Sequence, residues 1–247
     1  MGHLILVRHG QASFGTDDYD VLSERGWEQS RLLGAWLREQ GVSPTAIIHG
    51  SMRRHRETAE GVMGAAGWND LVVAGDPGWD EFDHVGLVAG HPDLADGATD
   101  VRSVDRRRFQ EIFEDVTARW TAGDQVGALE SYADFLLRVR TSLARAMKVC
   151  GSGETVVVVT SGGPIAAVAA SLVDPEGTDP GSDSGSDSGS DSVGDPAAQA
   201  VTARLWSRFN TVSVNAAYTR VLVGSTGARL LTFNEHHHLR GEQVTYR

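Results

Sequence analysis

One run of residues, Thr-Val-Val-Val-Val at 155–159, limits the folds open to this chain more than any other feature. In a strand, its valines would make both faces apolar, and such strands are typical of the middle of a parallel sheet. The run ends in Ser-Gly-Gly-Pro at 161–164, and an alanine-rich segment that favours a helix follows at 165–172. A proline just inside a helix start is favourable, because its missing N–H would have had no partner there. We therefore expect a strand, a turn and a helix in this order.

Strand and helix patterns alternate along the rest of the chain. Further strands are expected at 3–7, 45–48, 71–74, 211–216, 218–223 and 228–233, the last two joined as a hairpin. Helices are expected between Ser23 and Gly41 and at 54–63, 106–120, 131–149 and 199–206. This alternation predicts an α/β fold, a three-layer α/β/α sandwich with a mainly parallel central sheet. Ligands of such sheets bind beyond the carboxyl ends of the strands, where the turns after 3–7 and 155–159 lie.

The domain organisation follows from length and local composition. A chain of 247 residues is long enough for one sizeable α/β domain, and we expect a single domain. The stretch at about 76–127 is irregular and polar, and we interpret it as a cap-like insert. Residues 174–196 contain three Gly-Ser-Asp-Ser repeats and hardly any apolar side chain. Such a segment cannot recover the entropy lost on ordering, so we expect a disordered acidic insertion there.

The charge and the cysteine content exclude some classes of partner and bear on the cellular location. The formal net charge is −11, of which seven negative charges lie in 174–196. A nucleic-acid partner is not expected, because a phosphate backbone needs a basic face. No apolar run reaches the ~18 residues of a membrane span, and the N-terminus is interpreted as the first strand rather than a signal peptide. Cys150 is the only cysteine, which favours a reducing cytoplasm; the oligomeric state stays open.

Arg8, His9 and Gly10 follow the first expected strand directly. An imidazole is unprotonated over much of the neutral range and is a competent phosphoryl acceptor. Arg8 would supply a permanent planar charge to phosphate oxygens, and Gly10 would let the backbone approach a ligand closely. The alternative is a structural histidine at a strand end. Because a strand precedes the histidine and a turn follows it, we favour a phosphoryl-transfer site.

At this point the chain resembles the histidine phosphatase, or phosphoglycerate mutase-like, superfamily over nearly its whole length outside the acidic insertion. Leu-Val-Arg-His-Gly at 6–10 is similar to the family signature, and Leu-Ser-Glu-Arg-Gly at 22–26 to the opening of its first helix. The run at 50–59 resembles the second arginine motif, whose arginine stands four residues before Thr-Ala, here Arg54. Glu81 falls where the family has its acidic proton donor.

The resemblance implies a mechanism for a small or medium phosphate ester. His9 would attack the phosphorus in line to form a phosphohistidine, while Arg8 and Arg54 neutralise the equatorial oxygens. Glu81 would give a proton to the leaving alkoxide and then take one from the attacking water. No metal or other cofactor is implied, since the arginines supply the positive charge.

The chain departs from the family pattern at the turn after the valine run. The family carries a second histidine there, and this chain has Ser161. Backbone N–H groups at Gly162 and the Ser161 hydroxyl can still bind a phosphate, but the hydroxyl brings no charge. Loss of the imidazole is expected to matter, since the loss of one such stabilising group costs on the order of a hundredfold or more in rate in other enzymes. Our hypothesis is that His84, or else His238, compensates. Gly15 stands where many members have an asparagine near the phosphate, and Gln11 and Ser13 are expected to take over that role.

Two alternatives to a phosphatase stay open. A phosphoglycerate mutase would need added cations to grip a substrate carboxylate, and the short acidic insert makes hydrolysis the preferred hypothesis. Loss of the second histidine also fits a catalytically weak protein that binds a phosphorylated ligand. The run His236-His237-His238 suggests no metal site, because adjacent side chains in an extended chain point to opposite sides.

Overall fold

The computed structural model describes residues 1–13, 20–95, 106–124, 130–175 and 196–246. It contains two compact units, which we describe separately. The first unit comprises Met1–Asp80 and Val139–Arg247, and the second is Glu81–Arg138.

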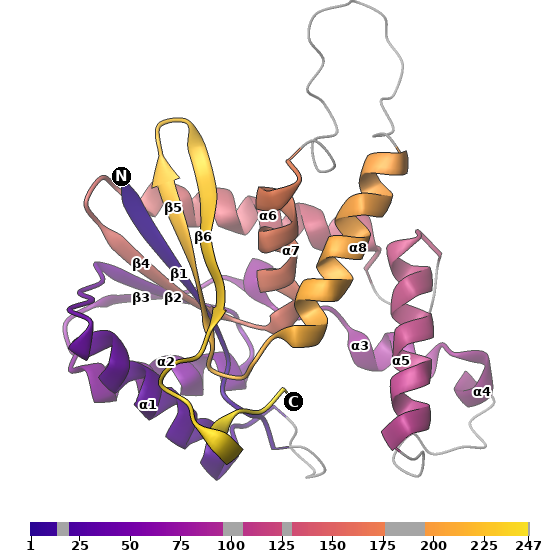
Figure 1. Ribbon diagram of the computed structural model, residues 1–247, viewed down its shortest axis with the longest axis horizontal. Helices are drawn as coiled ribbons and strands as arrows, with labels where there is room; N and C mark the ends of the chain where they lie inside the picture. The colour runs from indigo at the N-terminus through magenta and orange to yellow at the C-terminus, as the bar shows by residue number, and fades with distance from the viewer. Residues whose placement is uncertain (14–19, 96–105, 125–129, 176–195, 247) are drawn as a thin grey trace, which may run out of the picture. The chain divides into compact units, whose positions relative to one another are not determined.

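The first unit is built on a six-stranded sheet with the strand order β3-β2-β4-β1-β5-β6 (Figure 1). Four strands are parallel to one another: β1 (Gly2–Arg8), β2 (Ala46–His49), β3 (Val72–Gly75) and β4 (Thr155–Thr160). The other two, β5 (Tyr218–Gly224) and β6 (Gly227–Glu235), form an antiparallel hairpin at one edge. The mainly parallel sheet is thus confirmed. Strand β4 lies between β2 and β1, and its four valines are fully buried, as their sequence predicted.

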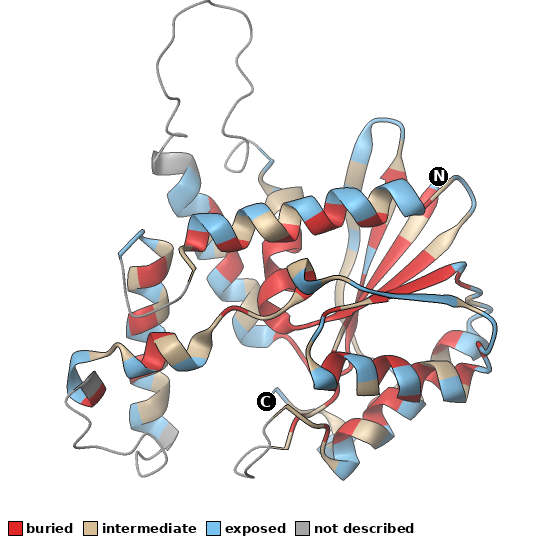
Figure 2. Ribbon diagram, turned by 180° about the vertical axis from the view of Figure 1, so that it is seen from behind, coloured by how far each residue is buried: buried red, intermediate tan, exposed pale blue. Residues whose placement is uncertain are grey.

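Helices lie on both sides of this sheet, which gives three layers (Figures 1 and 2). On one side α1 (Glu24–Glu39) packs against α2 (Arg53–Ala66). On the other side lie the later part of α6 (Tyr132–Val149) and α7 (Gly162–Val173), with α8 (Pro196–Val212) packed against α7. The small side chains of α7 are buried from 162 to 170, so this helix packs closely against β1 and β6. The three-layer α/β/α prediction therefore holds.

The start of α1 is set by the capping residue that the sequence indicated. Ser23 has an extended backbone, and its Oγ accepts a hydrogen bond from the Gly26 N–H at 3.1 Å. This bond satisfies one of the donors that a helix start leaves without a partner. Gly41 has a φ of 69° just after the helix ends, in the left-handed region that glycine adopts without strain.

The strand expected at 211–216 is wrong. Helix α8 continues to Val212, and residues 213–217 follow an irregular path before β5 begins at Tyr218. Their backbone groups bind the end of β1 instead of a neighbouring strand. The Ala216 N–H donates to the His9 carbonyl at 3.1 Å, and the Ser213 carbonyl accepts from the Arg8 guanidinium. The alternating Thr-Val-Ser-Val pattern at 211–214 is therefore divided between the last residues of α8 and a segment that contacts the end of β1.

The second unit has a small core of its own. It holds α3 (His84–Ala89), α4 (Pro92–Ala95), α5 (Arg106–Thr121) and the first turns of α6. Phe82 stacks on Trp120 with ring centroids 5.0 Å apart, and Phe135 packs edge-on to Phe82. This unit overlaps the insert expected at 76–127. Most of the acidic insertion expected at 174–196 lies outside the described residues, and every described helix is too short or too polar to cross a bilayer.

Candidate active site

His9 stands directly after β1, and its backbone is held from two sides. Its N–H donates to the Thr160 carbonyl of β4 at 2.8 Å. Its carbonyl accepts from the Ala216 N–H at 3.1 Å and from the Asn215 side-chain amide at 3.3 Å. The side chain is buried, with 6% exposed. The imidazole is therefore presented by a rigid part of the sheet, at the carboxyl end of a parallel strand, where such folds bind ligands.

The hydrogen bonding of His9 selects its tautomer. Nδ1 lies 2.7 Å from the Gly10 carbonyl oxygen. Because a carbonyl only accepts, Nδ1 carries the hydrogen and Nε2 carries the lone pair. Burial, followed by the charges of Arg54, Arg8 and His55, holds the pKa of His9 well below 6.5, although the bond to Gly10 opposes this shift. The ring is thus neutral at neutral pH, and Nε2 can act as a nucleophile.

Two guanidinium groups act on this imidazole. Arg8 ends β1 and donates to the Ser213 carbonyl. Gly162, at the start of α7, lies beside this guanidinium, since a Cβ there would be in ordinary van der Waals contact with Arg8 Nε at 3.5 Å. Arg54 lies in the first turn of α2 and is 4% exposed. Two arginines whose charges reach a neutral nucleophile make a site suited to a phosphate.

Arg54 has an acidic partner that the sequence did not indicate. Its Nη1 donates to Asp20 Oδ1 at 2.8 Å, and the other Asp20 oxygen accepts from the Arg53 N–H at 2.8 Å. The Asp20 side chain is 41% exposed, whereas that of Arg54 is 5% exposed. No local pattern marks Asp20, because the two residues are 34 positions apart. An anion bound at Arg54 would meet this carboxylate as a competitor.

Gly10 and Gln11 contact α1 and α2 of the scaffold. The Gly10 N–H donates to Thr58 Oγ1 at 3.0 Å, and the Gln11 N–H donates to Gln29 Oε1 at 2.8 Å. The Gln11 side-chain oxygen accepts from the Ser23 hydroxyl at 3.2 Å, at the start of α1. In this structure both residues thus attach the strand end to the helices, beside the roles toward a ligand that the sequence suggested.

Ser161 contacts His55, a histidine that we did not predict to be part of the site from the sequence. It follows β4, is fully buried, and its Oγ lies 2.7 Å from Nε2 of His55. The His55 ring centroid is 5.7 Å from that of His9. In the sequence, His55 is one member of the basic run at 53–56. The available signal was the combination of an extra histidine beside Arg54 with the missing histidine at 161.

Three further candidates, Glu81, His84 and His238, are divided between the two units. Glu81 and His84 belong to the second unit, where the His84 ring stands edge-on to Phe82 at 6.2 Å. His238 belongs to the first unit, and its ring centroid is 6.3 Å from that of Tyr218. Among the histidines of the first unit, His55 is thus the one that the structure places beside His9.

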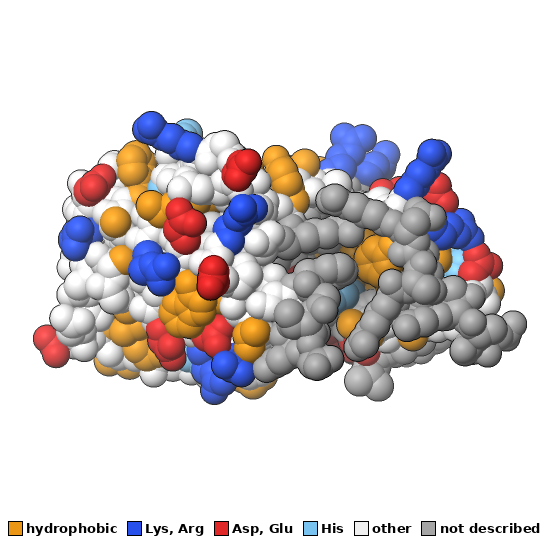
Figure 3. All heavy atoms as spheres, turned by 90° about the horizontal axis from the view of Figure 1, so that it is seen from below, with side chains coloured by type: hydrophobic (Ala, Val, Ile, Leu, Met, Phe, Trp, Pro, Cys, Tyr) orange, Lys and Arg blue, Asp and Glu red, His pale blue; other side chains and the backbone are white. Residues whose placement is uncertain are grey.

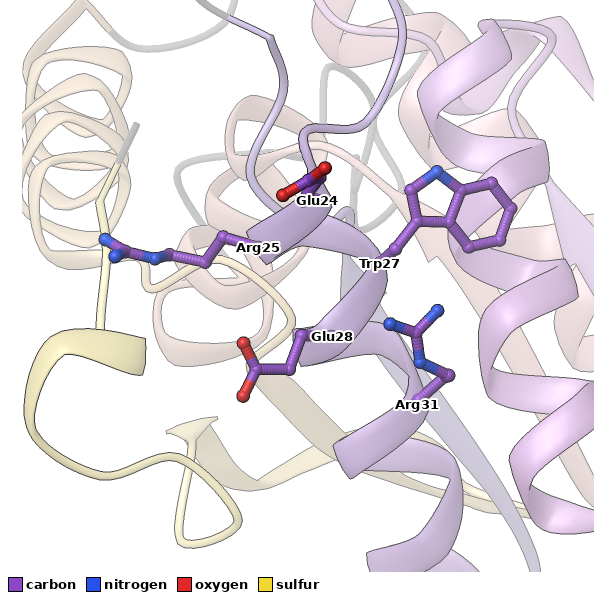
Figure 4. A pocket seen from close by; sticks show the side chains of 5 residues that line it. All are labelled: Glu24, Arg25, Trp27, Glu28 and Arg31. Atoms are coloured by element: carbon purple, nitrogen blue, oxygen red, sulfur yellow. The ribbon is translucent and has the colours of Figure 1, made fainter.

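A separate hollow lies on α1, and His9 is not among the residues that line it. It is lined by Glu24, Arg25, Trp27, Glu28 and Arg31 (Figure 4). Glu28 accepts from Gln243 at 3.0 Å, and Arg25 lies 4.0 Å from Glu242, so these two charged groups face the C-terminal segment. On the face seen in Figure 3, acidic and basic side chains are interspersed wherever side chains are coloured.

Comparisons with known proteins show the family and the fold. The family model described as the histidine phosphatase superfamily (branch 1) matches residues 4–183. The mitochondrial serine/threonine-protein phosphatase Pgam5 of Drosophila willistoni is 40% identical over 73 residues, which are 29% of this chain and 25% of that protein. The match thus spans about a quarter of the length of this curated relative.

Two solved structures illustrate the shared fold. YhfR of Bacillus stearothermophilus aligns with a TM-score of 0.61 at 19% identity, over 96% of this chain and 98% of that one. A phosphoglycerate mutase from Bacillus anthracis aligns with a TM-score of 0.56 at 17% identity, over 96% and 94% of the two chains. At these identities the likeness concerns the fold.

Proposed function

The chain belongs to the histidine phosphatase superfamily, and on this premise we propose that it hydrolyses small or medium phosphate monoesters through a phosphohistidine on His9. The observation that carries the proposal is the state of His9. It is a buried, neutral imidazole with its lone pair on Nε2, beside two arginines. A nucleophile of this kind needs no further base to attack phosphorus.

In the proposed first step, Nε2 of His9 forms a bond to phosphorus as the bond to the ester oxygen breaks. Arg8 and Arg54 neutralise the non-bridging oxygens, where negative charge sits throughout the transfer. The N–H groups at the start of α7, at Gly162, add donors with the favourable end of the helix dipole. The displaced alkoxide takes a proton from Glu81.

In the proposed second step, water attacks the phosphohistidine and gives its proton to Glu81. The phosphorus–nitrogen bond breaks, inorganic phosphate leaves, and His9 returns to its neutral form. Glu81 thereby ends the cycle protonated, as it began, so that protons and charges balance. The arginines carry the positive charge that phosphoryl transfer requires.

The cations of the second unit favour hydrolysis over a mutase reaction. A mutase must hold a substrate carboxylate as well as the phosphate. In the described part of this unit, Arg107 pairs with Glu111 at 3.4 Å and Arg119 with Asp124 at 3.2 Å. Arg108 pairs with both Asp93 and Glu111. These cations already have acidic partners on the same unit, which supports the hydrolase.

Phosphate release from p-nitrophenyl phosphate tests the proposal. We expect turnover by the wild type, loss of turnover in His9→Ala, and an acid-labile phosphoenzyme of the wild type visible by intact mass after a rapid alkaline quench. Exchange of 3-phosphoglycerate isomers without net phosphate release would instead identify a mutase. Binding of inorganic phosphate without turnover of any ester would identify a binding protein.

A further inference from the structure

Ser161 uses its hydroxyl in an unusual way for its position. It is the N-cap residue of α7, where a serine side chain ordinarily accepts from the N–H groups of the first turn. Here the side chain makes no capping bond and lies 2.7 Å from His55 Nε2 instead. Both side chains are fully buried, and the two residues are 106 positions apart. The contact is therefore a feature of the tertiary structure.

The other nitrogen of His55 faces a carboxylate. Nδ1 lies 3.7 Å from Asp80 Oδ1. Asp80 is itself fixed, because its Oδ1 accepts from the Ser51 N–H at 2.6 Å and its Oδ2 accepts from the Ser51 hydroxyl. Burial raises the pKa of Asp80, but the attraction of the nearby His55 and the hydrogen bonds from Ser51 outweigh it and lower the pKa overall. A carboxylate in this place orients the imidazole and stabilises its protonated form.

The backbone makes room for this pair. A Cβ on Gly50 would overlap His55 Nδ1 and would lie 2.6 Å from Asp80 Oδ1. Any larger residue at position 50 would thus push the imidazole or the carboxylate away. These three residues come from different parts of the chain. Gly50 directly follows β2, His55 lies in the first turn of α2, and Asp80 follows the 3-10 turn Pro77–Trp79.

Resting on the proposed function, we propose that His55, oriented by Asp80, acts through the Ser161 hydroxyl to supply the second-histidine role that position 161 itself has lost. In its protonated form His55 donates from Nε2 to Ser161 Oγ. The hydroxyl hydrogen of Ser161 is then free to donate to a non-bridging oxygen of the phosphoryl group. No proton is transferred; the two hydrogen bonds shorten as charge develops, and His55 is a positioning residue for Ser161.

The charged surroundings of His55 are consistent with this role. Asp80 favours a protonated ring, while the full burial of His55 opposes it, and the neighbouring His9 ring, with centroids 5.7 Å apart, is neutral. A bound phosphate adds negative charge and shifts this balance toward the protonated ring. Ser161 itself has an unstrained extended backbone, with φ −111° and ψ 174°, unlike the strained turn that presents a serine nucleophile in acyl-transfer enzymes.

Moving the histidine back tests the proposal. We expect His55→Ala to lower kcat on p-nitrophenyl phosphate by about a hundredfold with little change in KM, because the lost interaction strengthens only in the transition state. The double variant His55→Ala/Ser161→His should recover at least about tenfold of that loss, since it returns an imidazole to the place where the family carries one. A merely structural His55 predicts no such recovery, and a double variant no faster than His55→Ala overturns the proposal.

A conservative variant guards against a folding defect. His55→Gln can still donate an amide hydrogen to Ser161 but carries no charge, so its kcat should lie between those of the wild type and His55→Ala. Thermal unfolding of each variant is followed in parallel. A stable His55→Gln or His55→Ala protein with wild-type kcat also overturns the proposal.

Two parallel assays separate this inference from the function on which it rests. If the wild type releases no phosphate, or His9→Ala releases as much as the wild type, both the proposed function and the role of His55 fail. If only His9→Ala is inactive and His55 variants are unaffected, the role of His55 alone fails. Hydrolysis of p-nitrophenyl acetate that survives in His9→Ala but not in Ser161→Ala would show an acyl-transfer serine, and would overturn both.

Discussion

Gly10 and Gly26 meet backbone to backbone: a Cβ on Gly10 would overlap the carbonyl oxygen of Gly26. The contact is just as close from the other side, because a Cβ on Gly26 would overlap the carbonyl oxygen of Gln11, the residue after Gly10. The first turn of α1 therefore lies directly against the residues that follow His9. Rigid backbone atoms cannot yield as a flexible side chain can, so this contact transmits any change in α1 to the nucleophile.

We predict that Gly26→Ala destabilises the protein by about 1–3 kcal/mol and lowers phosphatase kcat, because the added methyl group displaces the strand end that carries His9. Urea unfolding and steady-state kinetics measure the two effects. Gly64→Ala is the matched control, since Gly64 lies in the exposed part of α2 and a Cβ there meets nothing within 4 Å. Removing a helical glycine there should stabilise the protein by up to about 1 kcal/mol. A Gly26→Ala protein as stable as the wild type would contradict the close contact.

The parts of the fold that the sequence predicted are those decided by local chemistry. The valines of β4, the Ser23 cap and the proline near the start of α7 each act within a few residues of themselves. The meeting of the turns after β1 and β4 was also predictable. Both strands are parallel, and neighbouring parallel strands end at the same edge of a sheet.

The parts that could not be predicted depend on contacts between distant residues. Nothing near His55 in the sequence distinguishes a buried partner of Ser161 from an exposed member of a basic helix face. Likewise, the segment 213–217 has the alternation of a strand, but its backbone groups bind Arg8 and His9. Hydrophobic periodicity indicates which residues face the core, but it does not indicate which backbone groups a segment will contact.

The lowered pKa of His9 predicts activity in mildly acidic solution. Burial and the charges of Arg54 and Arg8 keep the imidazole neutral to a pH well below 6.5, and only the neutral ring can attack. The acid limb of kcat/KM, which reports the free enzyme, should therefore lie well below pH 6.5. Arg8→Gln removes one of the charges and should move this limb toward higher pH. An acid limb at the ordinary histidine value in the wild type would contradict the burial of a neutral His9.

The ion pair between Arg54 and Asp20 predicts a gain in phosphate affinity when the carboxylate is removed. Asp20→Asn keeps the size of the side chain and removes a negative charge that competes with phosphate for Arg54. A partly exposed pair contributes up to about 1 kcal/mol, so inorganic phosphate should inhibit the variant up to about fivefold more strongly. Asp70→Asn, at an exposed position, controls for the change in net charge. Weaker inhibition of Asp20→Asn would mean that Asp20 holds Arg54 in place for phosphate.

His238 predicts a loss of stability in acid that is independent of catalysis. Burial, followed by repulsion from His236 and His237, lowers its pKa from 6.5 to about 4, although the nearby backbone of Ala216 opposes the shift. Because the folded pKa is the lower one, the stabilising contribution is complete above pH 6.5 and is lost as the pH falls toward 4. At about 1.4 kcal/mol per pKa unit, the loss amounts to about 3 kcal/mol.

Thermal unfolding between pH 7 and pH 4 measures this contribution. His238→Gln cannot take up the proton, so its Tm should fall less steeply over this range than that of the wild type. His237→Gln alters an exposed neighbour that acts on His238 only through weak repulsion, and it should retain nearly the whole wild-type slope. The lowered pKa of His9 also makes the fold less stable in acid, but this effect is the same in the wild type and in both variants. Parallel slopes for the wild type and His238→Gln would therefore show that His238 takes up its proton without opposing the fold.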